Sequence, residues 1–231
     1  MSEARSEVRK ATDASTESNV VPREVWMNEA WGPPPRSRDV AVESKSDTTQ
    51  ELPAIKIENG NKTGKVSDEF KEKTEKIINA LPEDVKQLLR KLDIKIVAAP
   101  GFDVPAPPGA LGVLDDRTNT VTISERAHQG KPEEVLSATA YHEVGHALDG
   151  VFLRESNDAK FQKALEADRK ALSLAMKRSL VDYMSKDEDA YAESFAESFA
   201  YRQVERTGGK IPDQFLKLFQ HTITYMRKKY P

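Results

Sequence analysis

The sequence predicts an α+β domain that is mostly helical, carries a small β-sheet and follows a disordered N-terminal region. Three observations lead to this prediction. Residues 1–64 show no sustained apolar period, the β-type stretches fall within 93–124, and the pattern from Pro132 to the end is helical. Order is expected to begin near Val66, which divides the chain into a disordered region, 1–64, and one folded domain, 65–231.

The N-terminal region is rich in Ser, Thr, Glu, Arg and Pro, as in "GPPPRSR" and "ESKSDTTQE". Trp26 and Trp31, within "REVWMNEAWGPPP", are the exception. They belong either to a loosely attached tail or to a short binding motif, because aromatic residues beside prolines suit recognition in a groove. The composition also resembles the export region of injected bacterial effectors, and the sequence start lacks the apolar core of a signal peptide.

Composition excludes several other classes. The mean hydropathy of −0.64 is low for a fully packed chain, which suits one globular domain plus unfolded sequence. The net charge of −3 gives no reason to expect nucleic acid as a partner. The chain has no cysteine, so neither disulfides nor thiolate metal sites form. No apolar run approaches the roughly 18 residues that a membrane span needs.

Two helices are expected at the start of the folded domain. "SDEFKEKTEKIINAL", 67–81, has apolar residues at helical spacing and Ser67 or Asp68 as its N-cap. "PEDVKQLLRKL", 82–92, begins a second helix with Pro82 at the first helical position and acids in the first turn.

The β-type segments come next. "DIKIVAA", 93–99, alternates and predicts a strand. A Pro/Gly loop follows, and "LGVLDDRTNTVTIS", 111–124, then predicts a hairpin that turns around residues 115–119.

The C-terminal half is expected to be helical from Pro132 onward, with breaks near 150–157, 185–189 and 207–212. The last helix is expected over 213–230. Its apolar side would consist of Phe215, Leu218, Phe219, Ile223 and Met226.

The first helix of this half carries a metal-binding pattern, His142-Glu143-x-x-His146, within "PEEVLSATAYHEVGHALDG". Residues four apart project from one helical face, so both imidazoles can share one tetrahedral zinc ion. Glu143 lies about 100° round the helix, where it can take a proton from a metal-bound water. Small residues on the flanks leave room for close packing and a metal: Ala138, Ala140, Gly145 and Ala147.

A catalytic zinc needs a third protein ligand. The candidates are His128, His221 and the acids around "AYAESFAESFAYR". There Asp189, Glu193 and Glu197 follow one stripe of a predicted helix, although like charges four residues apart repel by a few tenths of a kcal/mol. Either histidine is more typical of a surface or packing residue, so we expect a carboxylate from this stripe to complete the site.

"YHEVGHALDG" followed 40–50 residues later by "ESFAESF" resembles the catalytic domain of anthrax toxin lethal factor and its relatives (the ATLF-like family), which include the secreted Pro-Pro endopeptidases. The resemblance covers residues 66–231 and implies a zincin-like metallopeptidase domain. It places the third zinc ligand at Glu193 and a supporting acid at Glu197. Asp149, in "HALD", also matches, as a supporting residue or as a structural residue at the helix end.

The chain departs from the family pattern at two points. The four-residue repeat permits a second register, in which Asp189 is the ligand and Glu193 supports it. Family members also carry a tyrosine about seven residues before the ligand, where it stabilises the oxyanion. Lys186 holds that position here, and Tyr183 is the candidate that replaces it.

These features together predict a zinc endopeptidase with one Zn²⁺ per chain, in which Glu143 is the general base and Tyr183 assists at the oxyanion. The substrate would be a protein or peptide bound as an extended strand along "NTVTIS", 119–124. Two alternatives remain: a zinc hydrolase acting on a non-peptide substrate, and a catalytically silent peptidase-fold protein that only binds partners. A secreted or injected toxin or effector is the expected setting.

Overall fold

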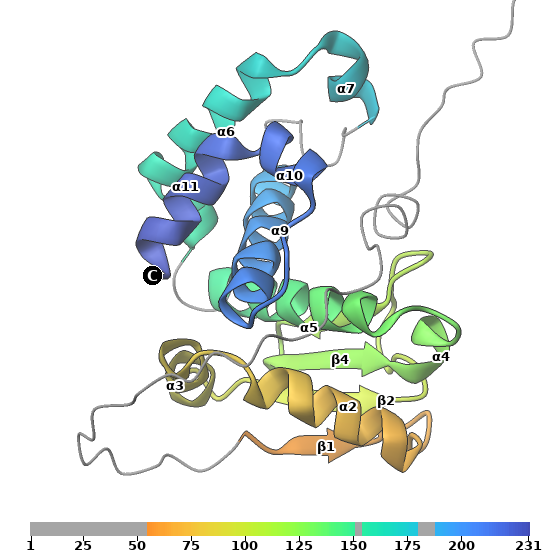
Figure 1. Ribbon diagram of the computed structural model, residues 1–231. Coiled ribbons are helices and arrows are strands. Elements are labelled where there is room, and N and C mark those ends of the chain that lie inside the picture. Colours follow the sequence, from red (N-terminus) through yellow and green to blue (C-terminus); the bar gives the residue numbers. More distant parts are fainter. Residues whose placement is uncertain (1–54, 151–153, 180–187) are drawn as a thin grey trace, which may run out of the picture.

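The computed structural model describes residues 55–150, 154–179 and 188–231 (Figure 1). This part of the chain is mostly helical and contains one four-stranded sheet, so the predicted α+β class is confirmed. Within it, no helix is both long and apolar enough to cross a membrane. Trp26, Trp31 and Tyr183 lie outside the described residues.

The sheet has the order β1-β2-β4-β3. Its strands are β1 (Ile57–Asn59), β2 (Lys95–Ala99), β3 (Gly112–Asp115) and β4 (Thr120–Ser124). β1 pairs with β2 and β2 with β4 in parallel, whereas β3 and β4 form the predicted antiparallel hairpin.

Strand β1 precedes Val66, so the expectation that residues 57–59 are disordered is wrong. Three residues are too few to show an alternating pattern, and this strand is instead defined by its pairing with β2. Ile57 lies opposite Ile96, and both side chains are buried in the core.

The expectation that an extended substrate pairs along residues 119–124 is also wrong. β4 lies inside the sheet, between β2 and β3, so both of its edges are already paired. The edge strand on this side is β3, because β4 and not β3 pairs with β2. The sequence shows a hairpin but not which of its two strands meets β2.

The first two helices of the domain, which precede the histidine motif, begin close to their predicted positions. α2 (Asp68–Asn79) is capped by Ser67, whose hydroxyl accepts a hydrogen bond from the Phe70 backbone N–H at 3.2 Å. α3 (Glu83–Lys91) follows Pro82, which is the N-cap rather than the first helical residue.

A long buried helix, α5 (Glu133–Leu148), lies next to α2 on the sheet, with the short α4 (Glu125–His128) before it (Figure 1). α2 contacts β1 and β2, while α5 contacts β3 and β4. Apolar residues of the two central strands pack beneath them, among them Ile96, Ala98, Val121 and Ile123.

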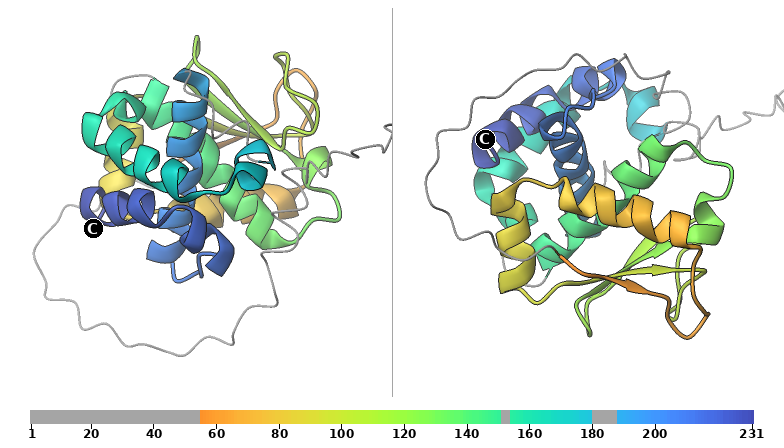
Figure 2. Two further views of the ribbon diagram at one scale, coloured as in Figure 1. Left: turned by 90° about the horizontal axis from the view of Figure 1, so that it is seen from above. Right: turned by 60° about the horizontal axis from the view of Figure 1, so that its bottom comes forward.

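The C-terminal helices form the other half of the domain, and α5 lies between them and the sheet (Figures 1 and 2). In chain order they are the 3₁₀ turn η2 (Glu155–Asn157), α6 (Ala159–Ala171), α7 (Leu174–Ser179), α9 (Glu188–Arg206), α10 (Asp213–Leu218) and α11 (Gln220–Lys229). α9 packs directly across α5 and brings its acidic stripe to the histidine motif.

The last predicted helix is in fact two, because the backbone leaves helical geometry at Phe219 (φ −124°, ψ 39°). Asp168 of α6 compensates for the break. Its carboxylate accepts hydrogen bonds from the backbone N–H groups of His221 (2.9 Å) and Thr222 (2.8 Å) and from the Thr222 hydroxyl (2.6 Å). A side chain more than fifty positions away thus caps α11, which local periodicity cannot reveal.

We expect Asp168→Ala to lower the free energy of unfolding by about 2 kcal/mol, because three donors at the start of α11, two of them buried, would lose their carboxylate acceptor. Urea denaturation in the presence of a chelator measures this loss without a contribution from bound metal. The control is Asp158→Ala, which removes the N-cap of α6 from the Lys160 backbone N–H. A cost for Asp168→Ala no greater than that of the control contradicts the capping role.

Candidate metal centre

Helix α5 delivers the histidine motif to the interior of the domain. Its N-terminus follows Pro132, and its first turn carries acids that suit the helix dipole. The His142 side chain is almost completely buried, while the His146 side chain is 20% exposed toward a cleft. The two imidazoles lie on one face of the helix, as their spacing of four predicts.

The two helices of the site meet at a glycine. A Cβ placed on Gly145 would lie 2.9 Å from the Ala196 Cα, closer than real Cβ atoms approach a backbone, and 3.3 Å from the Ala196 Cβ. Only glycine therefore permits this approach of α5 and α9. Glu193 lies one turn before Ala196, so the same contact brings its carboxylate over the two histidines.

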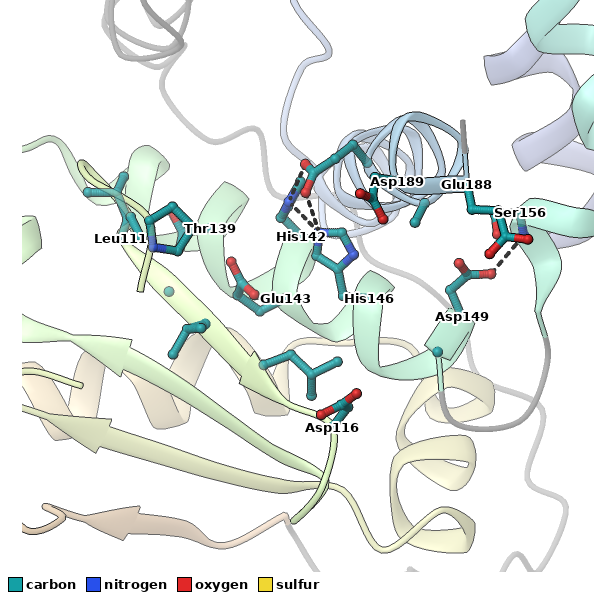
Figure 3. A pocket seen from close by; sticks show the side chains of 18 of the residues that line it. Leu111, Asp116, Thr139, His142, Glu143, His146, Asp149, Ser156, Glu188 and Asp189 are labelled. Carbon is teal, nitrogen blue, oxygen red and sulfur yellow. Dashed lines mark hydrogen bonds and ion pairs between the residues drawn. The ribbon is translucent and has the colours of Figure 1, made fainter. Parts of the chain in front are cut away.

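Three potential ligand atoms converge at this point (Figure 3). The His142 Nε2 and His146 Nε2 atoms are 3.0 Å apart. The Glu193 carboxylate oxygens lie 3.5 Å from His142 Nε2 and 3.3 Å from His146 Nε2. Zinc bonds of about 2.0 Å in a tetrahedron give ligand separations of about 3.3 Å, so this triangle has the size of a zinc site.

Glu197 determines which ring nitrogen of His142 carries the proton. Its Oε2 lies 3.0 Å from His142 Nδ1, and because a carboxylate only accepts, Nδ1 must donate. In the neutral imidazole this leaves a lone pair on His142 Nε2, directed toward the Glu193 carboxylate. Two acceptors that face each other are stabilised by a positive charge between them, either a shared proton or a metal ion, so the donor set fits a divalent metal.

The charge state of Glu193 suits a metal ligand. Burial acts to raise its pKa, but hydrogen bonds and charge interactions with His142 and His146 outweigh burial and hold the pKa well below its usual range. The carboxylate is therefore ionised at neutral pH and available to bind a cation.

Asp189, the alternative ligand, lies one turn earlier on α9. It lines the same cleft but is exposed and does not belong to the group of converging ligand atoms (Figure 3). The geometry of the described residues therefore brings Glu193, and not Asp189, to the two histidines.

Asp149 occupies the end of α5. Its carboxylate accepts a hydrogen bond from the Ser156 backbone N–H at 2.7 Å, which ties η2 to the helix end (Figure 3). Burial raises its pKa, although the Ser156 hydrogen bond opposes that effect. Asp149 thus has a structural contact at the helix end, and its interaction with His146 is one of charge.

The other two histidines lie away from this centre. His128 is buried, and its Nδ1 donates a hydrogen bond to the Ser124 carbonyl at 2.7 Å. His221 is exposed on α11. Neither belongs to the group of converging ligand atoms.

The centre opens into a cleft of about 810 Å³. Glu143 points into it next to the two histidines (Figure 3). The edge strand β3 forms the facing wall, and a Cβ on Gly112 would lie 2.6 Å from the Glu143 Cγ. Sequence reasoning missed Gly112, although a glycine in a strand is itself a signal of close backbone approach.

The two ends of the cleft differ in character. One end is formed by the loop before β3, with Pro107, Pro108 and Leu111. The opposite end carries four acids, Asp116, Asp149, Glu188 and Asp189 (Figure 3), and Arg154, whose backbone N–H donates to the Asp149 carbonyl, also lines the cleft. The loop at the apolar end was predicted only as a connection and not as part of the site.

No protein-family model and no curated protein matches the sequence. Among solved structures, the Pro-Pro endopeptidase PPEP-2 from Paenibacillus alvei is similar, at 16% identity and a TM-score of 0.48. The match covers 76% of this chain and 96% of that chain. A similarity this remote assigns no function, so function has to follow from the residues of the cleft.

Proposed function

We propose that this chain is a zinc-dependent endopeptidase of the ATLF-like type. One observation carries the proposal: the ligand atoms of His142, His146 and Glu193 converge in a cleft that also holds the Glu143 carboxylate. A purely structural metal site has no need of such a base. The match of the two helical motifs to that family supports the same reading.

Zinc is the metal that suits two imidazoles and one carboxylate in a site of this size. When bound, it lowers the pKa of a coordinated water to about 7 and polarises a carbonyl oxygen. Glu197 supports the site by holding His142 in the tautomer whose Nε2 lone pair can bind a metal.

Glu143 is the proposed general base. It would take a proton from the attacking water and then deliver it to the amine of the leaving peptide. Its position between the histidines and the wall formed by Gly112 supports this role, because substrate entering the cleft passes beside its carboxylate.

The substrate is proposed to bind as an extended strand along β3. One edge of β3 pairs with β4, and Gly112, Val113 and Leu114 line the cleft. A peptide that adds to the other edge would run past Glu143, and its backbone would supply most of the hydrogen bonds. A cleft lined along a strand favours cleavage within a chain over removal of terminal residues.

The test is incubation of the zinc-loaded protein with a diverse peptide library and an unstructured protein, followed by mass-spectrometric identification of new N-termini. We expect cleavage that a chelator abolishes and that added zinc restores. A protein that binds one zinc but cleaves no peptide contradicts the proposal and favours a non-peptide hydrolase or a silent binding protein.

The role of Tyr183 and the export of the protein both stay predictions. Tyr183, proposed to assist at the oxyanion, lies outside the described residues. Secretion or injection depends only on the composition of the N-terminal region.

A further inference from the structure

We propose that Glu166, Arg169 and Tyr191 form a positioning clamp that holds Glu193 in register with the two histidines. The inference rests on the proposed metal site and adds residues on the far side of α9. None of the three belongs to the group of converging ligand atoms.

The clamp joins α6 to the first turn of α9. The Glu166 carboxylate accepts hydrogen bonds from Arg169 Nη1 at 2.9 Å and from the Tyr191 hydroxyl at 3.1 Å. The Arg169 guanidinium carbon lies 4.6 Å from the centre of the Tyr191 ring. Arg169 is only 5% exposed, so these charge-assisted and cation–π contacts are weakly screened by water.

Tyr191 and Glu193 lie on opposite sides of α9. Two positions correspond to about 200° of helical rotation, so a side chain that contacts α6 lies opposite one that faces α5. Glu193 belongs to the second turn of the described part of α9, the turn that follows Tyr191. The contacts of Tyr191 with α6 therefore fix the rotation of α9 about its own axis next to the turn that carries Glu193.

The metal site is sensitive to that rotation. An atom about 5–6 Å from a helix axis moves by about 1 Å when the helix rotates by about 10°. Metal–ligand distances hold to about 0.2 Å. A small loosening of the first two turns of α9 would thus pull Glu193 out of bonding range without unfolding the domain.

The chain supplies a matched control at the other end of the same helix. There Arg202 Nη1 lies 2.6 Å from the Glu205 carboxylate, and Arg202 Nε donates to the Tyr230 carbonyl at 2.7 Å. This arginine is also largely buried, with 13% of its side chain exposed, but it lies nine positions beyond Glu193. Removing it should loosen α9 only at its far end.

The experiment compares Arg169→Met and Tyr191→Phe with Arg202→Met. Zinc affinity is measured by competition with a chromophoric chelator, the visible spectrum of the Co²⁺-loaded protein reports coordination, and urea unfolding with chelator reports stability. We expect zinc binding about tenfold weaker and an altered Co²⁺ spectrum in Arg169→Met. Mutation of residues that orient metal ligands typically weakens metal binding about 10–100-fold, and a more distant clamp should lie at the low end of that range. Tyr191→Phe should weaken binding about threefold, Arg169→Lys should restore part of the loss, and Arg202→Met should bind as the wild type.

Each other outcome is decisive. Wild-type affinity and spectrum in both clamp variants overturn the clamp and leave the metal site intact. An equal loss in Arg202→Met overturns it too, because the effect is then one of general stability. If Arg169→Met does not fold, the zinc affinity and Co²⁺ spectrum of Tyr191→Phe decide whether the clamp exists. A wild-type protein that binds no metal overturns the proposed site itself.

Discussion

Glu143→Gln is expected to reduce peptide cleavage about 10³-fold while leaving zinc binding unchanged. Glutamine has nearly the same shape but cannot accept a proton, and general-base catalysis contributes about 10²–10⁴ in rate. A 10³-fold loss corresponds to about 4 kcal/mol of transition-state stabilisation. Glu143 does not belong to the converging ligand group, so the metal should stay. Steady-state kinetics on a cleaved library peptide and zinc analysis of the same sample measure both quantities.

The control for this prediction is Glu133→Gln, which makes the same exchange at an exposed position in the first turn of α5. It should retain wild-type activity and zinc. If Glu143→Gln keeps more than a tenth of the wild-type kcat/KM, another group takes the proton and the assigned role is wrong.

Gly145→Ala is expected to weaken zinc binding tenfold or more. The new methyl group would lie 2.9 Å from the Ala196 Cα, so the α5 and α9 backbones must move apart, and Glu193 would move away from both histidines. Alanine gains about 1 kcal/mol of helix propensity over glycine, but overpacking of this kind costs about 1–3 kcal/mol. Unfolding in chelator should therefore show a small net loss, and chelator competition should show the larger effect on zinc.

Gly101→Ala is the matched substitution, because a Cβ there would have its nearest neighbour at 3.8 Å. It should leave zinc affinity unchanged. Wild-type zinc affinity in Gly145→Ala would mean that the close contact of the two helices does not set the geometry of the centre.

Much of the fold follows from local sequence signals. Ser67 and the apolar spacing after it place α2, and the hairpin from Gly112 to Ser124 is evident from its alternation. Features set by distant contacts were wrong or absent in the sequence prediction. β1 is a strand because it pairs with β2. β4 is internal because it pairs with both β2 and β3. The helix break at Phe219 is stabilised by hydrogen bonds to Asp168.

The residues of the site also fall into those that local sequence predicts and those that depend on contacts between distant segments. His142, Glu143 and His146 share one helix, so their relation is fixed by helical geometry and is readable from the sequence. The third ligand comes from a second helix with a four-residue repeat, so the sequence favoured Glu193 over Asp189 only by its closer match to the family motif and its longer side chain. The structure separates the two acids because α9 meets α5 at Ala196 and Gly145, one turn after Glu193, and local sequence does not encode this contact between distant residues.

The most direct test of the central claim is the zinc dissociation constant of the wild type, Glu193→Gln and Asp189→Asn, with metal content determined by elemental analysis. We predict one zinc per wild-type chain, unchanged binding in Asp189→Asn, and binding weakened at least about 100-fold in Glu193→Gln, as expected when one of three protein ligands is lost. Loss of zinc in Asp189→Asn with retention in Glu193→Gln, or a wild-type protein that binds no zinc, would contradict the account.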